Sequence, residues 1–236
     1  MSDRADVKAP SKSEETRRRI LDAALTLFLE RGFENATMRE IADKAGVATG
    51  AAYYYFASKD AIVLAFYERA NQEMAPRIEQ VLESTTDLQK RLAGILDVKL
   101  GYFAPSRRLL TALAAHVDPG HPVSPFSEAT RAIREQDIAQ FERAVTGSRT
   151  RLAKDMVEPL PRLLWMYQMA LILYWIHDRS PGQSKTAALI EGSLRLIVRL
   201  IQLSSLPLMR PLRRQIVELC ADAGLTAGPE GHPTTA

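Results

Sequence analysis

The sequence of 236 residues is poor in several features that would define a class of protein by themselves. It contains one cysteine, Cys220, so it cannot form an intrachain disulfide, and a reducing compartment is expected. Glycine is sparse, with 12 residues, and no alternation of polar and apolar residues typical of strands stands out. The net charge at pH 7 is only +3, which excludes a strong general attraction to nucleic acid. We therefore expect a cytoplasmic, all-α protein that selects its partners through local features.

Long apolar runs and catalytic motifs are also missing. The most apolar segment, residues 163–176, has 14 uncharged residues, which is short for a membrane-spanning helix of about 20 residues. There is no Gly-x-Ser-x-Gly, no phosphate-binding glycine loop and no His-Glu-x-x-His, so we expect neither an enzyme nor a cofactor. His116, Asp118 and His121 lie in a proline-rich loop with spacing unsuited to a metal site, so no metal is expected.

The most informative segment is residues 37–59, which read TMREIADKAGVATGAAYYYFASK. Thr37 and Glu40 have the spacing of a helix capping box, and Gly46 fits the left-handed position that ends a helix. Residues 48–55 predict a second helix, which is too short to be stable unless it packs on a neighbour. Two short helices joined by a glycine turn are typical of a helix-turn-helix, whose second helix enters the DNA major groove.

Helices before and after this segment would complete a compact bundle. Residues 16–31 place apolar side chains such as Ile20 at helical spacing, and Ser58 fits the N-cap of a following helix. Residues 17–62, RRRILDAALTLFLERGFENATMREIADKAGVATGAAYYYFASKDAI, resemble the TetR family of bacterial transcriptional regulators. The resemblance implies an N-terminal three-helix helix-turn-helix DNA-binding domain followed by a larger helical ligand-binding and dimerisation domain.

The resemblance also implies which residues contact a double-stranded DNA operator. They are Thr37, Arg39, Ala48, Thr49, Gly50, Ala51, Tyr53, Tyr54, Tyr55 and Lys59. Arginine can hold a guanine through two hydrogen bonds, and tyrosine hydroxyls reach phosphate oxygens. For Tyr53 and Tyr55, partial burial as core aromatics is an equal alternative. Because hydroxyl residues are usual in the family at positions 48 and 51, Ala48 and Ala51 predict weak capping and few base contacts here.

Charge gives little further guidance about DNA binding. The first 60 residues carry ten basic and ten acidic side chains, which cancel. Affinity would therefore come from local placement of Arg17, Arg18, Arg19, Arg39, Lys44 and Lys59. Base specificity is expected to depend on Arg39, Thr49 and Tyr54.

Composition and proline positions divide the chain into four expected parts. These are a disordered arm (1–13), the DNA-binding domain (14–74), an effector-binding and dimerisation domain (75–223) and a flexible tail (224–236). After residue 57 we expect helices over 58–74, 76–84, 87–103, 106–117, 127–145, 153–177 with a kink near Pro159 and Pro161, 185–204 and 211–223.

Two of these expected helices, over residues 160–176 and 188–206, are too apolar for the surface of a monomer. The resemblance implies a homodimer that pairs its last long helices and binds a near-palindromic site. A well-packed monomer core is the alternative. The residues expected in the dimer interface are Trp175, Leu189, Leu194, Ile197 and Ile201.

Finally, the resemblance implies a small-molecule effector that shifts the population of DNA-binding states. The expected contacts are Tyr102, His116, Trp165, Gln168, Tyr174 and His177, and their apolar surroundings favour a hydrophobic or aromatic compound. The leading interpretation is a repressor released from its operator by a largely apolar effector. The alternative is an architectural or effector-independent DNA-binding dimer whose C-terminal domain only dimerises.

Overall fold

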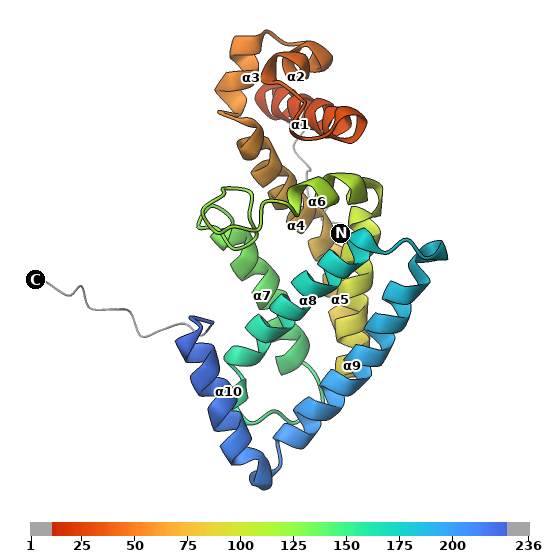
Figure 1. Cartoon of the computed structure of the whole chain (residues 1–236), viewed down its shortest axis with the longest axis vertical. Coiled ribbons are helices and arrows are strands. Elements are labelled where there is room, and N and C mark those ends of the chain that lie inside the picture. The colour runs from red at the N-terminus through yellow and green to blue at the C-terminus, as the bar shows by residue number, and fades with distance from the viewer. Residues whose placement is uncertain (1–10, 226–236) are drawn as a thin grey trace, which may run out of the picture. The chain divides into compact units, whose positions relative to one another are not determined.

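The computed structural model describes residues 11–225, and within this range the chain is helical and contains no strand (Figure 1). The α-helices are α1 (Lys12–Arg31), α2 (Met38–Ala45), α3 (Thr49–Tyr55), α4 (Lys59–Ser84), α5 (Leu88–Phe103), α6 (Arg107–Leu113), α7 (Arg131–Thr146), α8 (Pro159–His177), α9 (Ser184–Ser204) and α10 (Arg210–Asp222). Short 3₁₀ turns are η1 (Ala104–Ser106), η2 (Lys154–Met156), η3 (Pro181–Gln183) and η4 (Pro207–Met209). The predicted all-α fold is confirmed. None of the described helices combines the length and hydropathy needed to cross a membrane.

The described chain forms two compact units. The first unit contains residues 11–69 and 108–130, and the second contains residues 70–107 and 131–225. Residues 108–130, which lie within the predicted 75–223 domain, therefore pack with the DNA-binding helices.

The first unit is built around α1, which packs against α2, and α2 in turn packs against α3. Side chains from all three helices are fully buried, including Ile20 of α1, Ile41 of α2 and Ala52 of α3. The segment after α6 is held by buried hydroxyls: Ser124 Oγ donates to the carbonyl of Val117 at 3.0 Å and Thr130 Oγ1 to that of Ser124 at 2.7 Å.

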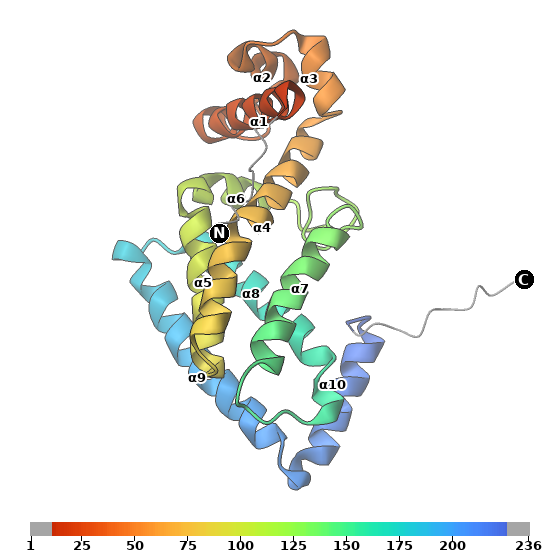
Figure 2. The same cartoon turned by 180° about the vertical axis from the view of Figure 1, so that it is seen from behind.

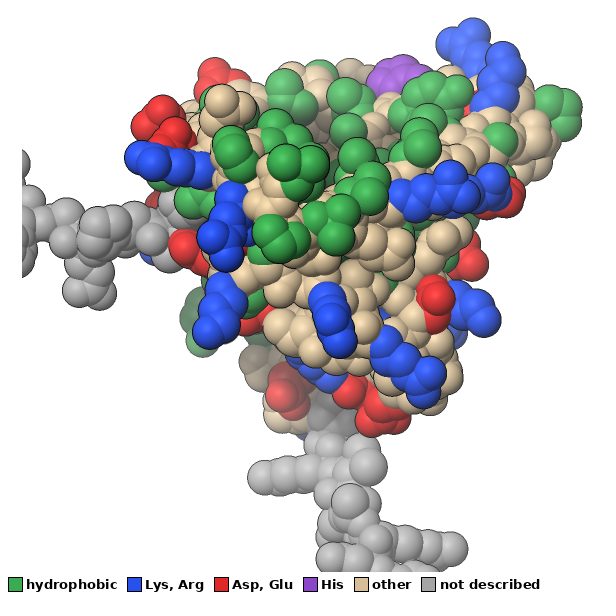
Figure 3. Space-filling model, turned by 90° about the horizontal axis from the view of Figure 1, so that it is seen from below, with side chains coloured by type: hydrophobic (Ala, Val, Ile, Leu, Met, Phe, Trp, Pro, Cys, Tyr) green, Lys and Arg blue, Asp and Glu red, His purple; other side chains and the backbone are tan. Residues whose placement is uncertain are grey.

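The second unit is a helical bundle in which α5 contacts α7 and α9, and α8 contacts α7 and α9 (Figures 1 and 2). Its core contains aliphatic and aromatic side chains from α4, α5, α7, α8 and α9. Large apolar side chains of α8 and α9 also remain at the surface. Figure 3 shows hydrophobic side chains gathered in a band on one side of the molecule, with lysine and arginine around it.

Several predicted helix limits are wrong at their N-terminal ends. Residues 12 and 13 of the predicted disordered arm belong to α1, because Ser11 forms a capping box with Glu14 as the N-cap of this helix. Residues 1–10 of that arm and 226–236 of the predicted tail lie outside the described residues. The predicted helix 127–145 begins only at Arg131, since the hydroxyls of Ser124, Ser127 and Thr130 bind turn carbonyls instead.

Proline positions account for further differences. The predicted break before Pro76 is absent, and α4 is continuous through it. Pro76 lies on the exposed side of α4 while Met74, Ile78 and Leu82 are buried, so packing favours one helix and water reaches the freed carbonyl. The predicted helix 153–177 is instead η2 followed by α8, which begins at Pro159 because proline suits a first helical turn. The predicted helix 106–117 ends earlier, at Leu113.

Candidate nucleic-acid interface

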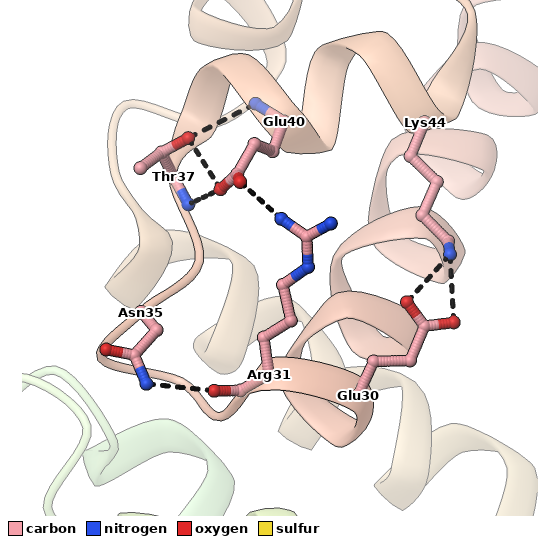
Figure 4. Close-up of polar contacts among 6 residues, drawn as sticks. All are labelled: Glu30, Arg31, Asn35, Thr37, Glu40 and Lys44. Carbon is pink, nitrogen blue, oxygen red and sulfur yellow. Dashed lines mark hydrogen bonds and ion pairs between the residues drawn. The ribbon is translucent and has the colours of Figure 1, made fainter.

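The α2–turn–α3 element is fixed by local hydrogen bonds that its sequence dictates (Figure 4). Thr37 Oγ1 accepts from the amide of Glu40 at 3.2 Å, and Glu40 Oε2 accepts from the amide of Thr37 at 2.9 Å. This confirms the predicted capping box. Gly46 ends α2 with φ +65° and ψ +41°, the left-handed conformation that glycine adopts without strain. Thr37 and Glu40 therefore fix the start of α2, and Gly46 fixes its end and the turn into α3.

Charged side chains fasten α2 to α1. Arg31 Nη1 lies 2.5 Å from Glu40 Oε1, and Lys44 Nζ lies 3.0 Å from Glu30 Oε1 (Figure 4). Arg19 Nη2 donates to the carbonyl of Ala45 at 2.8 Å, at the C-terminal end of α2. Hydrogen bonds from Thr37, followed by the nearby Arg31, lower the pKa of Glu40. The capping carboxylate is therefore ionised at neutral pH.

Helix α3 packs on the rest of the first unit with one side and exposes the other side to solvent. Its N-cap, Ala48, provides no side-chain hydrogen bond, as predicted. The helix instead packs through Ala52 and the following Phe56, both buried, and the guanidinium of Arg17 lies 4.9 Å from the centre of the Phe56 ring. Tyr53 is 51% exposed and Tyr54 83% exposed, so neither is a core aromatic.

All ten residues predicted to contact DNA lie on the surface of the first unit. Half-buried are Thr49, Ala51, Tyr55 and Lys59; exposed are Thr37, Arg39, Ala48, Gly50, Tyr53 and Tyr54. The predicted residues thus lie at the N-terminal end of α2, at the N-cap of α3 and along it, and at the start of α4, and none of them is buried.

Lys59 has a contact that sequence reasoning missed. Its Nζ donates to the carbonyls of Phe33 at 2.7 Å and Glu34 at 3.0 Å, and lies 4.8 Å from the centre of the Phe33 ring. The ammonium therefore ties the start of α4 to the loop after α1. Of the basic residues expected near DNA, Arg18 and Arg39 make no hydrogen bond or ion pair with the described residues and are exposed.

The six expected effector contacts are divided between the two units. His116 belongs to the first unit, where its Nε2 lies 3.0 Å from Glu34 Oε1 and its ring stacks on that of His121 at 4.2 Å. The other five lie in the second unit: Trp165 and Gln168 are buried, Tyr102 is half-buried, and Tyr174 and His177 are exposed. Among residues 11–225, no group of three or more His, Cys, Asp or Glu side chains is arranged to hold a metal ion.

A cleft of about 690 Å³ in the second unit contains none of these six residues. It is lined by the α4–α5 turn (83–88), the loop 149–151, and Val198 and Gln202 of α9. Arg149 and Arg151 lie beside Glu83 and Asp87 in this lining, so the cleft is polar and carries both signs of charge.

The expected dimer residues divide into two groups. Leu189 is exposed and Ile197 half-buried, whereas Trp175, Leu194 and Ile201 are buried within the subunit and have little surface left for a partner. Large apolar side chains of α8 and α9 are exposed, and we call this set the apolar face: Met166, Leu173, Tyr174, Leu189, Leu196, Leu200 and Leu203.

A capped short helix, a left-handed glycine turn and a second short helix that presents its outer side define a helix-turn-helix DNA-binding protein. Residues 20–66 match the family model described as bacterial regulatory proteins, tetR family. Residues 91–218, more than half of the chain, match the model described as tetracyclin repressor-like, C-terminal domain. The chain therefore belongs to the TetR family of transcriptional regulators.

Curated relatives match over about a third of this chain's length. The transcriptional activator FasR of Mycolicibacterium smegmatis is 37% identical over 84 residues, which cover 36% of this chain and 38% of FasR. The transcriptional repressor KstR2 of the same species is 33% identical over 86 residues, which cover 36% of this chain and 42% of KstR2. The chain thus spans less than half the length of these curated relatives.

Solved structures show the same fold over most of the chain. A putative TetR-family regulator from Syntrophomonas wolfei has a TM-score of 0.62 at 18% identity, covering 79% of this chain and 96% of that one. FadR from Bacillus subtilis, solved in complex with stearoyl-CoA, has a TM-score of 0.58 at 20% identity, covering 77% and 97%. At these identities the likeness shows the fold alone.

Proposed function

We propose that this TetR-family protein is a homodimeric repressor that binds a near-palindromic operator and leaves it when a small, largely apolar effector binds. One observation carries the DNA-binding part: α3 packs on the unit through the buried Ala52 and Phe56, while none of the residues expected to face DNA is buried. A rigid helix with an open outer face is what insertion into a major groove requires.

Within this surface the side chains have different proposed roles. Arg39 reads a base, because its guanidinium is exposed and makes no hydrogen bond or ion pair with the described residues. Tyr54 reaches a base edge or the backbone from the outermost position of α3. Thr37 and Lys59 contact phosphates while they also hold α2 and α4 in place.

The proposed dimer forms through the apolar face. Leu189, Leu196 and Leu203 are spaced seven residues apart along α9, so they lie on one side of the helix. Exposed leucines in such a row are costly in water and are typical of helix–helix pairing between subunits. A twofold-symmetric dimer presents two copies of α3, which is why the operator is expected to be near-palindromic.

Repression and an effector are supported by the relatives. KstR2 proteins from several actinobacteria are named repressors, whereas FasR is named an activator. FadR of Bacillus subtilis holds stearoyl-CoA, so this fold can enclose a ligand with a long apolar chain. We therefore propose repression, with effector binding in the second unit.

The test begins by selecting bound fragments from a pool of random DNA duplexes with the full-length protein. A near-palindromic consensus is expected. Arg39→Ala should then lose roughly 1–3 kcal/mol of binding free energy on the selected site and relax specificity at one base. Arg77→Ala is the matched control, because Arg77 is also exposed, makes no such bond with described residues, and lies in the second unit outside the set expected near DNA. Equal losses for Arg39→Ala on selected and random duplexes would exclude base reading by this residue.

A further inference from the structure

The interior of the second unit contains an ion pair that neither DNA binding nor dimerisation uses. Lys99 of α5 is 2% exposed, and its Nζ lies 2.7 Å from Oδ1 of Asp137 on α7. Gln168 of α8 is 1% exposed and donates through Nε2 to Oδ2 of Asp137 at 3.3 Å. Three helices thus bring a cation, an anion and an amide into one buried polar cluster.

This cluster lies among apolar side chains. The Lys99 Nζ is 5.7 Å from the centre of the Phe141 ring, and the three helices also contribute Leu96, Ile138 and Trp165 to the core. Desolvation lowers the pKa of Lys99, and the charge of Asp137 opposes this shift. A charged pair at such a place is expensive to bury, and replacement by aliphatic side chains would often be no less stable. The cluster therefore calls for a role other than stability.

The hydrogen bonds of the cluster are incomplete in one particular way. Oε1 of Gln168 has no hydrogen-bond partner among the described residues, and neither has the buried Oε1 of Gln140, one turn after Asp137 on α7. Both atoms are acceptors. Lys99 Nζ and Asp137 Oδ1 form an ion pair at 2.7 Å but make no hydrogen bond of good geometry, so the cluster holds unpaired acceptors and a donor that is also unpaired. The ammonium of Lys99 has three protons and can donate further. A group that donates to Gln168 and accepts from Lys99 would complete the arrangement.

We propose that the cluster of Lys99, Asp137 and Gln168 receives the neutral hydroxyl of an otherwise apolar effector. The inference rests on the proposed effector-responsive function and specifies the class of effector. A hydroxyl is at once donor and acceptor. Charge favours it over a carboxylate: Lys99 and Asp137 already cancel, so an anionic head group would add an uncompensated charge in an apolar interior. An alkylammonium group is excluded by the same reasoning.

The test uses probes that differ only in the head group. We would titrate the full-length protein with 1-decanol, with its isomer methyl nonyl ether, and with decanoate, following heat by calorimetry and tryptophan fluorescence. Trp165 lies one helical turn from Gln168, so occupancy should change its emission. Decanol should bind about tenfold tighter than the ether, which cannot donate. It should bind at least about 100-fold tighter than decanoate.

Two substitutions assign any preference to the cluster. Gln168→Leu removes the unpaired acceptor, so decanol should bind no better than the ether, whose affinity should not change. Gln168→Met repeats the test with an unbranched side chain in case leucine disturbs packing. Gln72→Leu is the matched control, because Gln72 is exposed on α4 and the preference for decanol should persist. Wild-type protein that binds none of the probes, or prefers the ether or decanoate, overturns the proposal; a buried water would then be the missing donor.

Measurements of DNA binding distinguish a failure of this inference from a failure of the proposed function on which it rests. If the protein binds a selected palindrome but shows no preference for decanol, the effector class is wrong and the regulator stands. If it prefers decanol but binds no palindrome over scrambled duplex, the regulator is wrong and the hydroxyl site stands. If both hold, decanol should lower the affinity for the palindrome and the ether should do so about tenfold less effectively.

Discussion

In the first unit, charged side chains lie at the surface and fasten helices to one another, whereas the second unit buries a charged pair and exposes leucines. Arg31 and Lys44 bind Glu40 and Glu30 across α1 and α2 at positions open to water. In the second unit, Lys99 is enclosed with Asp137, and Leu200 is 62% exposed.

The first unit needs no partner to cover its apolar side chains, whereas the second unit does. The first unit caps the start of α1 and of α2 with side chains, buries the apolar stripes of these helices and leaves a polar, tyrosine-bearing surface. The second unit leaves apolar area in water and acceptors without donors, both of which cost free energy. We infer that the first unit is a preformed DNA reader, and that the second unit depends on a second copy and a ligand.

The largest expected effect comes from breaking the buried pair. Lys99→Met leaves the Asp137 carboxylate without its cation in an apolar core, which should lower the free energy of unfolding by about 3 kcal/mol. Urea denaturation followed by circular dichroism measures this loss. Lys99→Met combined with Asp137→Leu should recover most of it, because the double variant has no unpaired charge. A double variant that recovers none of the lost stability would show that the buried pair stabilises the bundle.

The next effect tests the apolar face. Leu200→Asp places a charge among the leucines proposed to pair between subunits, and should raise the dimer dissociation constant by about 100-fold. Sedimentation equilibrium measures it. Val157→Asp is the matched control, since Val157 is an exposed apolar residue outside α8 and α9 and should leave the dimer intact. Identical association of wild type and Leu200→Asp would place the interface elsewhere.

The α2–turn–α3 element of the first unit could be predicted almost entirely from sequence because its determinants are local, whereas the packing of residues 108–130 with this unit was not predicted. The capping box at Thr37 and Glu40, the left-handed Gly46 and the unassisted N-cap at Ala48 each follow from residues within a few positions. The contact of Lys59 with the carbonyls of Phe33 and Glu34 was missed, because it joins residues about 25 positions apart.

The second unit was harder to predict because its helices are apolar on more than one side. On α9, Leu194 and Ile201 face the core while Leu196 and Leu203 face water, and composition cannot distinguish the two stripes. The pairing of Lys99 with Asp137 has no sequence signal, since the residues are distant and on separate helices. The helix break predicted at Pro76 was also wrong, because the effect of a proline depends on which side of α4 it occupies.

A smaller effect is expected at Lys59, which ties the start of α4 to the loop after α1 and is also proposed to contact DNA. Lys59→Met keeps the aliphatic stem but removes two charged hydrogen bonds, which should lower the free energy of unfolding by about 1.5 kcal/mol. It should also weaken binding to selected and random duplexes alike and reduce the slope of affinity against salt concentration. Denaturation and binding isotherms at several salt concentrations measure the two effects. An unchanged salt slope would restrict Lys59 to the structural role.

The smallest expected effect concerns the first unit, where the stability contributed by the capping box of α2 should depend on pH. Thr37→Ala should lower the free energy of unfolding by about 1 kcal/mol at pH 7. Hydrogen bonds from Thr37 hold the pKa of Glu40 below its ordinary value of 4.5, so that part of the stability is present above this value and is lost as pH falls through the lowered pKa. The difference between wild type and variant should therefore shrink below about pH 4.5.

Part of that difference should persist in acid, because Thr37 Oγ1 also accepts from the amide of Glu40 whatever the charge of the carboxylate. Thermal unfolding of the two proteins between pH 3 and pH 7 measures it (about 3 °C per kcal/mol for a chain of this length). Thr26→Ala is the control, since the Thr26 hydroxyl binds a backbone carbonyl of α1 and should give a difference independent of pH. A constant difference for Thr37→Ala would mean that the carboxylate contributes nothing through this hydroxyl, and that only the backbone bond fixes the start of α2.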